Sequence, residues 1–122
     1  LSMNAAIQIL QKDSEFYTSE GCFITELCNA PADDEASIAR ARVMPGITTR
    51  WHRLKDISER YVILEGHGRM EVGEMPPTEV GPGDVVLIPP NCRQRITNLG
   101  DSELLFLCIC IPGFRAEVYE EC

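Results

Sequence analysis

Short strand-like segments, each followed by turn-forming residues, recur along almost the whole chain. The segments combine β-branched, aromatic or alternating apolar residues, a composition typical of strands. Glycine, proline, aspartate and asparagine separate them and favour tight turns. The segments are residues 22–28, 37–43, 48–54, 60–65, 68–72, 84–88, 93–97 and 103–111. No convincing amphipathic helix lies among them, so the pattern predicts an all-β protein with roughly the strands of a jelly roll.

The length of the chain limits it to one unit of this kind. With 122 residues it can bury one hydrophobic core but not two of ordinary size. No internal repeat of useful length is present, so the sequence predicts a single domain over residues 1–122. Two end segments stay undecided, because residues 7–13 and 115–120 fit either a helical turn or an edge strand.

Charge and hydropathy exclude several classes of partner. The formal net charge is −8, with 19 acidic against 11 basic residues, and the resulting field repels nucleic-acid phosphates and anionic lipid. The longest apolar run, residues 104–111, is far shorter than the roughly 20 residues of a membrane-spanning helix. The N-terminus lacks the pattern of a secretory signal. We therefore expect a cytoplasmic protein with no nucleic-acid or membrane partner.

Six cysteines could suggest a disulfide framework. They lie inside apolar strand-like runs, and a chain of this length can bury enough core without disulfides. We therefore expect reduced thiols that pack in the interior.

A histidine and a carboxylate stand at fixed spacing between two glycines. Five residues separate Gly46 from His52, one separates His52 from Leu54, four separate Leu54 from Glu59, and six separate Glu59 from Gly66. Because residues i and i+2 of a strand point to the same face, His52 and Leu54 face the interior together if either does. Glu59 follows a short turn and opens the next strand, so its carboxylate is expected beside them.

A second spaced stretch follows, marked by Gly83, Pro89, Asn91, Gln94 and Asn98. Together the two stretches resemble the paired motifs of the cupin superfamily, as found in small single-domain cupins, and the resemblance covers about residues 37–112. It implies the cupin double-stranded β-helix, a jelly-roll barrel. It also implies that His52, Glu59 and Gln94 converge as metal ligands, with Leu54 and Gln94 standing where the motifs have histidines.

The ligand set that the resemblance implies contains one imidazole, one carboxylate and one amide oxygen. Such a set suits one divalent metal, zinc, manganese, iron or nickel, without selecting among them. The two-histidine, one-carboxylate triad of iron oxygenases is not available here, which disfavours dioxygenase chemistry. Other interpretations stay open, because His52 fits a packed core histidine and Gln94 fits a buried amide that satisfies backbone groups.

Glu59 is the residue with the largest chemical consequence. A carboxylate that points into an apolar barrel is costly unless it is paired, metal-bound or protonated. Without a metal, Glu59 with a raised pKa could act as a general acid or base, with His52 as its partner and Gln94 as an orienting donor. The alternative is a position at the rim, where Glu59 pairs with Arg53 or Arg60.

Other side chains near the two stretches are expected to have supporting roles. Tyr61, Leu54 and Cys92 are predicted to line a substrate pocket together with Gln94. His67 lies in a glycine-flanked hairpin turn and is predicted to face solvent.

These expectations combine into a function and an assembly. We expect a small polar metabolite in the barrel, with Glu59 and His52 as catalytic residues of a metal-assisted or acid/base isomerase or lyase. The alternative is a non-catalytic small-molecule-binding or regulatory cupin that has lost its metal. Apolar residues on both faces of segments 60–65 and 103–111 exceed what one small barrel can bury, which predicts a homodimer.

Overall fold

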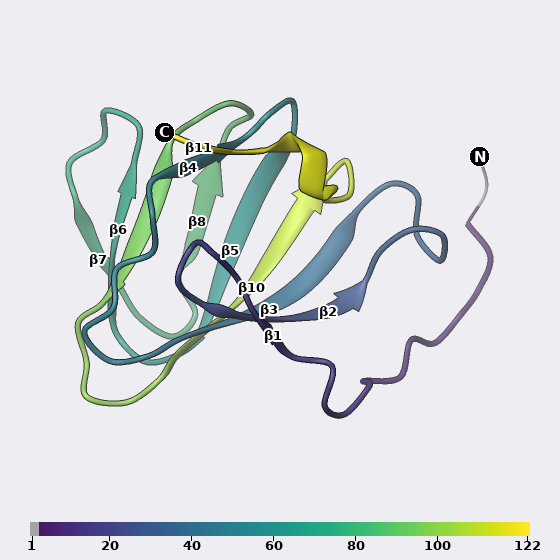
Figure 1. The fold of residues 1–122 in the computed structure, drawn as a ribbon, viewed down its shortest axis with the longest axis horizontal. Helices are drawn as coiled ribbons and strands as arrows, with labels where there is room; N and C mark the ends of the chain where they lie inside the picture. The colour runs from purple at the N-terminus through teal and green to yellow at the C-terminus, as the bar shows by residue number, and fades with distance from the viewer. Residues whose placement is uncertain (1–2) are drawn as a thin grey trace.

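The computed structural model describes residues 3–122, so the predicted domain begins two residues outside this range. The chain folds into two antiparallel sheets that face each other (Figure 1). The first consists, in spatial order, of β1 (Phe16–Tyr17), β2 (Phe23–Cys28), β3 (Ser37–Val43), β10 (Leu104–Ile111), β5 (Ser58–Glu65) and β8 (Val85–Ile88). The second consists of β11 (Tyr119–Glu121), β4 (His52–Leu54), β9 (Gln94–Asn98), β6 (Gly68–Val72) and β7 (Thr78–Val80).

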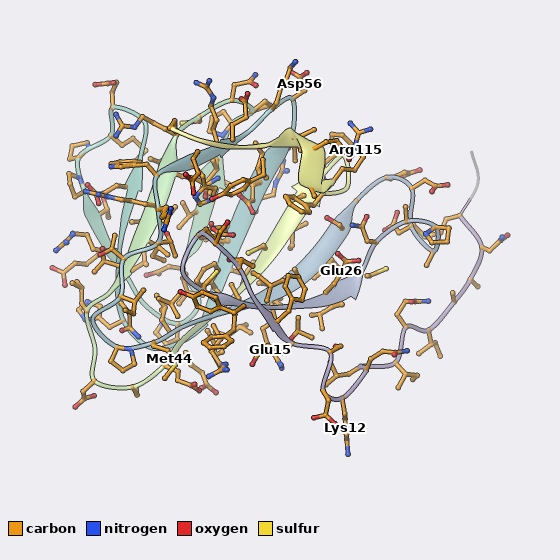
Figure 2. The ribbon with its side chains drawn as sticks, viewed as in Figure 1. Lys12, Glu15, Glu26, Met44, Asp56 and Arg115 are labelled. Carbon is orange, nitrogen blue, oxygen red and sulfur yellow. The ribbon has the colours of Figure 1, made fainter. Side chains whose placement is uncertain are left out.

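Side chains of alternate residues fill the space between the two sheets (Figure 2). On β10, for example, Leu104, Phe106, Cys108 and Cys110 are buried, while the residues between them are more exposed. This is the two-residue period of a strand that covers a core with one face. The largest cluster of buried apolar side chains includes members of both sheets, among them Ile63, Met70, Ile96 and Phe106. The sheets are therefore packed face to face.

The predicted strands are present, and three further strands accompany them. β1, β7 and β11 each have two or three residues and pair at the margins of the sheets. Both alternatives for the C-terminal segment occur, because a 3-10 helix at Ala116–Val118 leads directly into β11. Residues 7–13 form neither a helix nor a strand. Within residues 3–122, no helix is long and apolar enough to cross a membrane.

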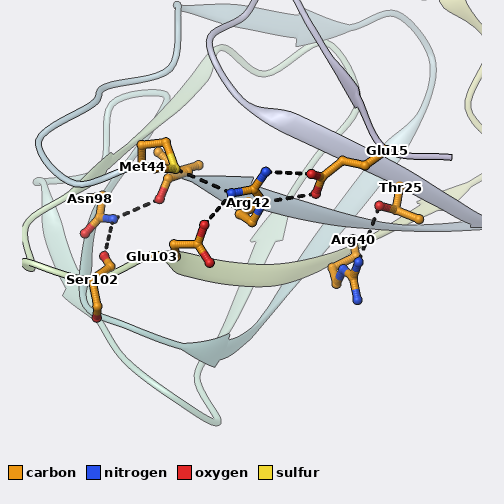
Figure 3. A network of polar contacts seen from close by, with 9 residues as sticks. Glu15, Thr25, Arg40, Arg42, Met44, Asn98, Ser102 and Glu103 are labelled. Carbon is orange, nitrogen blue, oxygen red and sulfur yellow. Dashed lines mark hydrogen bonds and ion pairs between the residues drawn. The ribbon is translucent and has the colours of Figure 1, made fainter. Parts of the chain in front are cut away.

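An arginine on the outer face of the first sheet fastens the segment that leads into β1. Arg42 on β3 donates hydrogen bonds to both carboxylate oxygens of Glu15, at 2.6 and 3.0 Å, and pairs with Glu103 (Figure 3). Its guanidinium also lies 4.3 Å from the centre of the Phe23 ring. The hydrogen bonds to Glu15 and Glu103 raise the pKa of Arg42 above its usual range. They hold the start of β1 against β3, and the β1–β2 loop follows from there.

Trp51, the single tryptophan, immediately precedes β4. The guanidinium groups of Arg93 and Arg95 lie 3.8 and 4.3 Å from the centre of its indole ring. Arg95 is itself held by the carboxylate of Glu71 on β6 at 2.6 Å. Cation–π contacts of this kind tie the residue beside His52 to β9 and β6.

Candidate functional site

His52 lies on the inner face of β4 and is almost fully buried, with 3% of its surface exposed. Its backbone pairs with Gln94 of β9. Nδ1 lies 2.7 Å from the carbonyl oxygen of Arg50, an acceptor, so Nδ1 carries a proton. The other ring nitrogen, Nε2, lies 3.3 Å from Oε2 of Glu20. The ring stacks on Tyr119 of β11, with 5.2 Å between the ring centres.

Glu59 is the first inward-facing residue of β5, and 7% of its surface is exposed. Oε1 accepts a hydrogen bond of 2.7 Å from Nε2 of Gln94, and Oε2 accepts a weaker one of 3.7 Å from the thiol of Cys110. Burial raises the pKa of Glu59 to about 7, although the Gln94 bond and the nearby His52 lower it. Burial therefore favours the neutral form of this carboxyl group.

The alternative position of Glu59 at the rim is wrong. The two arginines proposed as its partners are engaged elsewhere: Arg53 bonds to Glu120 at 3.0 Å, and Arg60 bonds to the hydroxyl of Ser58 at 2.7 Å. The inward orientation of Glu59 is thus confirmed, and its compensation comes from Gln94.

Glu20 completes the site, although no motif or spacing in the sequence marks it. It lies in the loop between β1 and β2, where the backbone N–H of Arg50 donates a 2.8 Å hydrogen bond to the Glu20 carbonyl oxygen. This bond fixes the loop against the segment that leads into β4. Burial raises the pKa of the Glu20 carboxyl, and His52 partly offsets this. Because Nδ1 of His52 donates to the Arg50 carbonyl oxygen, Nε2 is the ring nitrogen that faces the Glu20 carboxyl.

These side chains face a cavity of about 290 Å³ between the two sheets. Its wall is mostly apolar and aromatic, and its polar members come from the β1–β2 loop and the inner faces of both sheets. The residues that line it include Phe16, Glu20, Glu26, His52, Leu54, Glu59, Tyr61, Phe106, Phe114 and Tyr119. Two of the predicted pocket residues, Leu54 and Tyr61, are therefore in place.

Gln94 and Cys92, also predicted to line the pocket, are positioned differently. Gln94 is fully buried beside Glu59, and its Oε1 has no hydrogen-bond partner within residues 3–122. Cys92 lies before β9 and packs against the main apolar core, where its sulfur would be 3.0 Å from a Cβ at Gly73. Cys92 is not among the residues in the described part of the chain that line the cavity. His67 is exposed, and its Nε2 lies 2.7 Å from Glu79.

Three cysteine thiols also line the cavity, and burial makes them poor nucleophiles. The six cysteines are free, and Cys22, Cys108 and Cys110 line the cavity. Burial, reinforced by nearby Glu20, raises the pKa of Cys22 to about 12, and burial raises that of Cys108 well above its usual value. A thiolate nucleophile is therefore disfavoured at neutral pH.

The donors at the expected ligand positions do not fit a divalent metal. Leu54 offers no donor atom, Gln94 turns its amide nitrogen toward Glu59, and Nε2 of His52 faces Glu20. Across residues 3–122, no group of three or more histidine, cysteine, aspartate or glutamate side chains has the geometry to hold a metal ion. The arrangement instead gives two carboxyl groups and an imidazole that can exchange protons beside a cavity.

Comparison with known proteins gives a consistent relationship. The family described as cupin domain matches residues 39–110. An uncharacterized protein of Methanocaldococcus jannaschii is 34% identical over 108 residues, which cover 87% of this chain and 86% of that protein. A glucose-6-phosphate isomerase of Pyrococcus abyssi is 40% identical over 63 residues, covering 48% of this chain but only 33% of the isomerase.

A solved structure extends this likeness to the whole fold. The nucleoside dehydratase Pac13 of Streptomyces superposes with a TM-score of 0.77 and covers 96% of this chain and 92% of its own, at 16% identity. This identity supports similarity of fold alone. The predicted double-stranded β-helix is confirmed.

Proposed function

The chain belongs to the cupin domain family, and from this premise we propose that it is an acid/base enzyme, an isomerase or lyase. It moves a proton on a small polar metabolite held in the cavity between the sheets. The observation that carries the proposal is the set formed by the buried His52 and Glu59 and the half-buried Glu20 on the wall of this cavity. Two carboxyl groups and an imidazole in one apolar site are the parts that proton transfer requires.

Glu59 and His52 take the catalytic roles in this proposal. A general acid or base is most effective when its pKa lies near the working pH, and burial brings the pKa of Glu59 to about 7. Glu59 can therefore accept a proton from bound substrate or donate one to it. His52 and Glu20 form a second proton-exchanging pair. Gln94 is a positioning residue, because its amide fixes Oε1 of Glu59.

The names of related proteins support this class of reaction. Glucose-6-phosphate isomerases are among the sequence relatives, and a nucleoside dehydratase is among the structural neighbours. Isomerisation and elimination of water have a common requirement, since each removes a proton at one atom of the substrate and delivers one at another. The substrates named for those proteins are not thereby assigned to this chain.

A binding or regulatory cupin without catalysis is the second candidate. Its support is the aliphatic Leu54 at one expected ligand position and the amide of Gln94 at another. A metal-assisted reaction is the third, and it requires Gln94 to turn its oxygen inward and His52 to leave Glu20. The observed hydrogen bonds favour neither movement.

Proton exchange with solvent tests the catalytic proposal without knowledge of the substrate. Small polar metabolites that raise the melting temperature are incubated with the protein in D₂O, and NMR records deuterium incorporation at carbon or loss of water. We expect at least one binding compound to exchange. Glu59→Gln and His52→Gln should each abolish the exchange, while the surface variant Glu79→Gln should retain it. Ligands that bind but never exchange would establish the binding module instead.

Assembly and location are proposals of the same kind. A homodimer would cover the apolar outer face of the first sheet, where Leu87 is 68% and Val85 is 55% exposed. Closed two-fold symmetry is the commonest arrangement for soluble oligomers. The cytoplasmic location stays a prediction from the sequence.

A further inference from the structure

Acidic side chains outnumber basic ones on the cavity wall. Glu20, Glu26 and Glu59 line the cavity, and no lysine or arginine within residues 3–122 does so. His52 is the one basic side chain there, and it is already opposite Glu20. From this arrangement we infer that the ligand of the cavity is a small organic cation, an amine attached to an apolar body.

The nearby arginines do not compensate these carboxylates. Arg50 and Arg53, on either side of His52, direct their guanidinium groups to Glu121 and Glu120 at 3.2 and 3.0 Å. The side chains of both pairs are largely exposed to solvent. An anion in the cavity would therefore face three acidic side chains, with no lysine or arginine from residues 3–122 on the wall to pair with it, which is costly in an apolar setting. A phosphorylated sugar would carry two such charges.

The rest of the wall suits the apolar body and the charge of an amine. The rings of Phe16, Phe106, Phe114, Tyr61 and Tyr119 line the same space. Aromatic faces attract cations as well as burying apolar surface. A volume of about 290 Å³ accommodates a ring with a short side chain.

An unpartnered group on the wall points to a ligand independently of the carboxylates. The hydroxyl oxygen of Tyr119 is buried and has no hydrogen-bond partner within residues 3–122. A buried polar atom of this kind is normally satisfied. An ammonium group has three donors and no acceptor, so it can satisfy Tyr119 while it bonds to Glu20 and Glu59.

This inference deepens the proposed function, because it rests on the same cavity, but its test measures binding alone. Phenethylamine, phenethyl alcohol and hydrocinnamate share a ring and a two-carbon chain and differ in charge. Tryptamine, tryptophol and indolepropionate repeat the comparison with a larger ring. Calorimetric titration at neutral pH should give the order amine, alcohol, carboxylate in at least one series. We expect the amine to bind at least about tenfold more tightly than the carboxylate.

Variants identify the source of the preference. Glu20→Gln and Glu59→Gln should each weaken amine binding several-fold and leave alcohol binding unchanged, whereas Glu79→Gln on the surface should change neither. Two variants are used because either buried substitution alone could disturb the fold, which circular dichroism would reveal. A carboxylate that binds as tightly as its amine overturns the inference, as does the absence of amine binding in both series. Proton exchange on an anionic compound would overturn this inference while supporting the proposed function.

Discussion

Glu59 gives the stability of the protein an uncommon dependence on pH. Burial raises the pKa of its carboxyl from 4.5 to about 7 in the folded state. Between these values the folded protein holds a proton that the unfolded chain releases, so folding is favoured less as the pH rises. Below about 4.5 both states are protonated, and above about 7 both are ionised, so this contribution is constant outside that window.

We therefore predict that, between about pH 4.5 and about pH 7, the free energy of unfolding falls less in the Glu59→Gln variant than in the wild type. The difference between the wild type and the variant should change by at most on the order of 3 kcal/mol. Urea denaturation at several pH values measures it, with Glu79→Gln as the exposed control. Parallel curves for the wild type and Glu59→Gln would show that the Glu59 carboxyl is not buried as described.

Leu54 and Gln94, which stand where the cupin motifs have histidines, allow a second prediction. Gln94 pairs directly with His52, and Leu54 shares its inward face. Leu54→His together with Gln94→His should bring three imidazoles and the Glu59 carboxylate together, a good ligand set for zinc or nickel. We expect clear calorimetric binding by the double variant, weaker binding by each single variant and none resolved for the wild type.

Replacing His52 with alanine in the double variant is the control, because it removes one member of the set. The gain in metal binding should then be lost. If the double variant binds the metal no better than the wild type, the side chains at positions 54 and 94 do not bind the same ion as His52.

Individual site residues were predictable only where they follow regular spacing along strands. His52, Glu59 and Gln94 occupy strand positions whose facing is fixed by the two-residue period, and the structure brings them together. Glu20 reaches His52 from a loop more than thirty residues earlier in the chain. Its position depends on the fold of β1 and β2 against β4, and nothing in the local sequence distinguishes it from other surface glutamates.

Among the elements, the turn between β5 and β6 has the strictest sequence requirement. Gly66 adopts a φ of +93°, and a Cβ there would lie 2.7 Å from the carbonyl oxygen of Glu103 and 2.9 Å from Cα of Leu104. Both are backbone atoms that cannot move freely. We predict that Gly66→Ala lowers the free energy of unfolding by about 3 kcal/mol or more.

Gly46 is the matched control for this prediction. Its φ is +76°, but no atom lies within 4 Å of a Cβ built on it. Gly46→Ala should therefore cost only the backbone strain, about 1–2 kcal/mol. Denaturation of the two variants side by side separates strain from steric overlap, and equal losses would argue against the close approach at Gly66.

Strands with a complete apolar pattern were predictable, and those without one were not. The range predicted for β3 agrees with the observed strand, and β10 differs by a single residue. β1 and β7 were missed because two or three residues carry no period of their own. They become strands by pairing with β2 and β6. At the C-terminus, pairing with β4 makes residues 119–121 a strand.

For the whole molecule, the outer face of the first sheet leads to a prediction about assembly. Val85 and Leu87 on β8 lie exposed, opposite Val62 and Arg60 of β5, and form an apolar patch that would be favourable to cover. We predict a dimer in sedimentation equilibrium at tens of micromolar, a range set by ordinary interface affinities. Leu87→Glu should shift it toward monomer, whereas Met75→Glu, at an exposed turn of the other sheet, should not. A monomeric wild type would contradict the prediction.

The cupin fold was the most predictable property of the whole molecule. The spacing of the two motifs indicated about residues 37–112, and the family match covers residues 39–110. Glycine, proline and asparagine set that spacing, because each fixes a turn whose geometry tolerates few other residues. The chemistry inside the barrel was less predictable, since it depends on Glu20 and on the packing that buries the carboxyl groups.

The single tryptophan gives the protein a built-in optical reporter. Trp51 stands next to His52 in the chain, and its indole is held by Arg93 and Arg95, on either side of Gln94 along the chain. Indole emission responds to the position of nearby charges. Movement of β4 or β9 on ligand binding should therefore change the emission maximum or the intensity of Trp51 fluorescence. A phenyl-based ligand is not excited at the red edge of indole absorption. Occupancy could therefore be followed in the unlabelled wild-type chain, in real time.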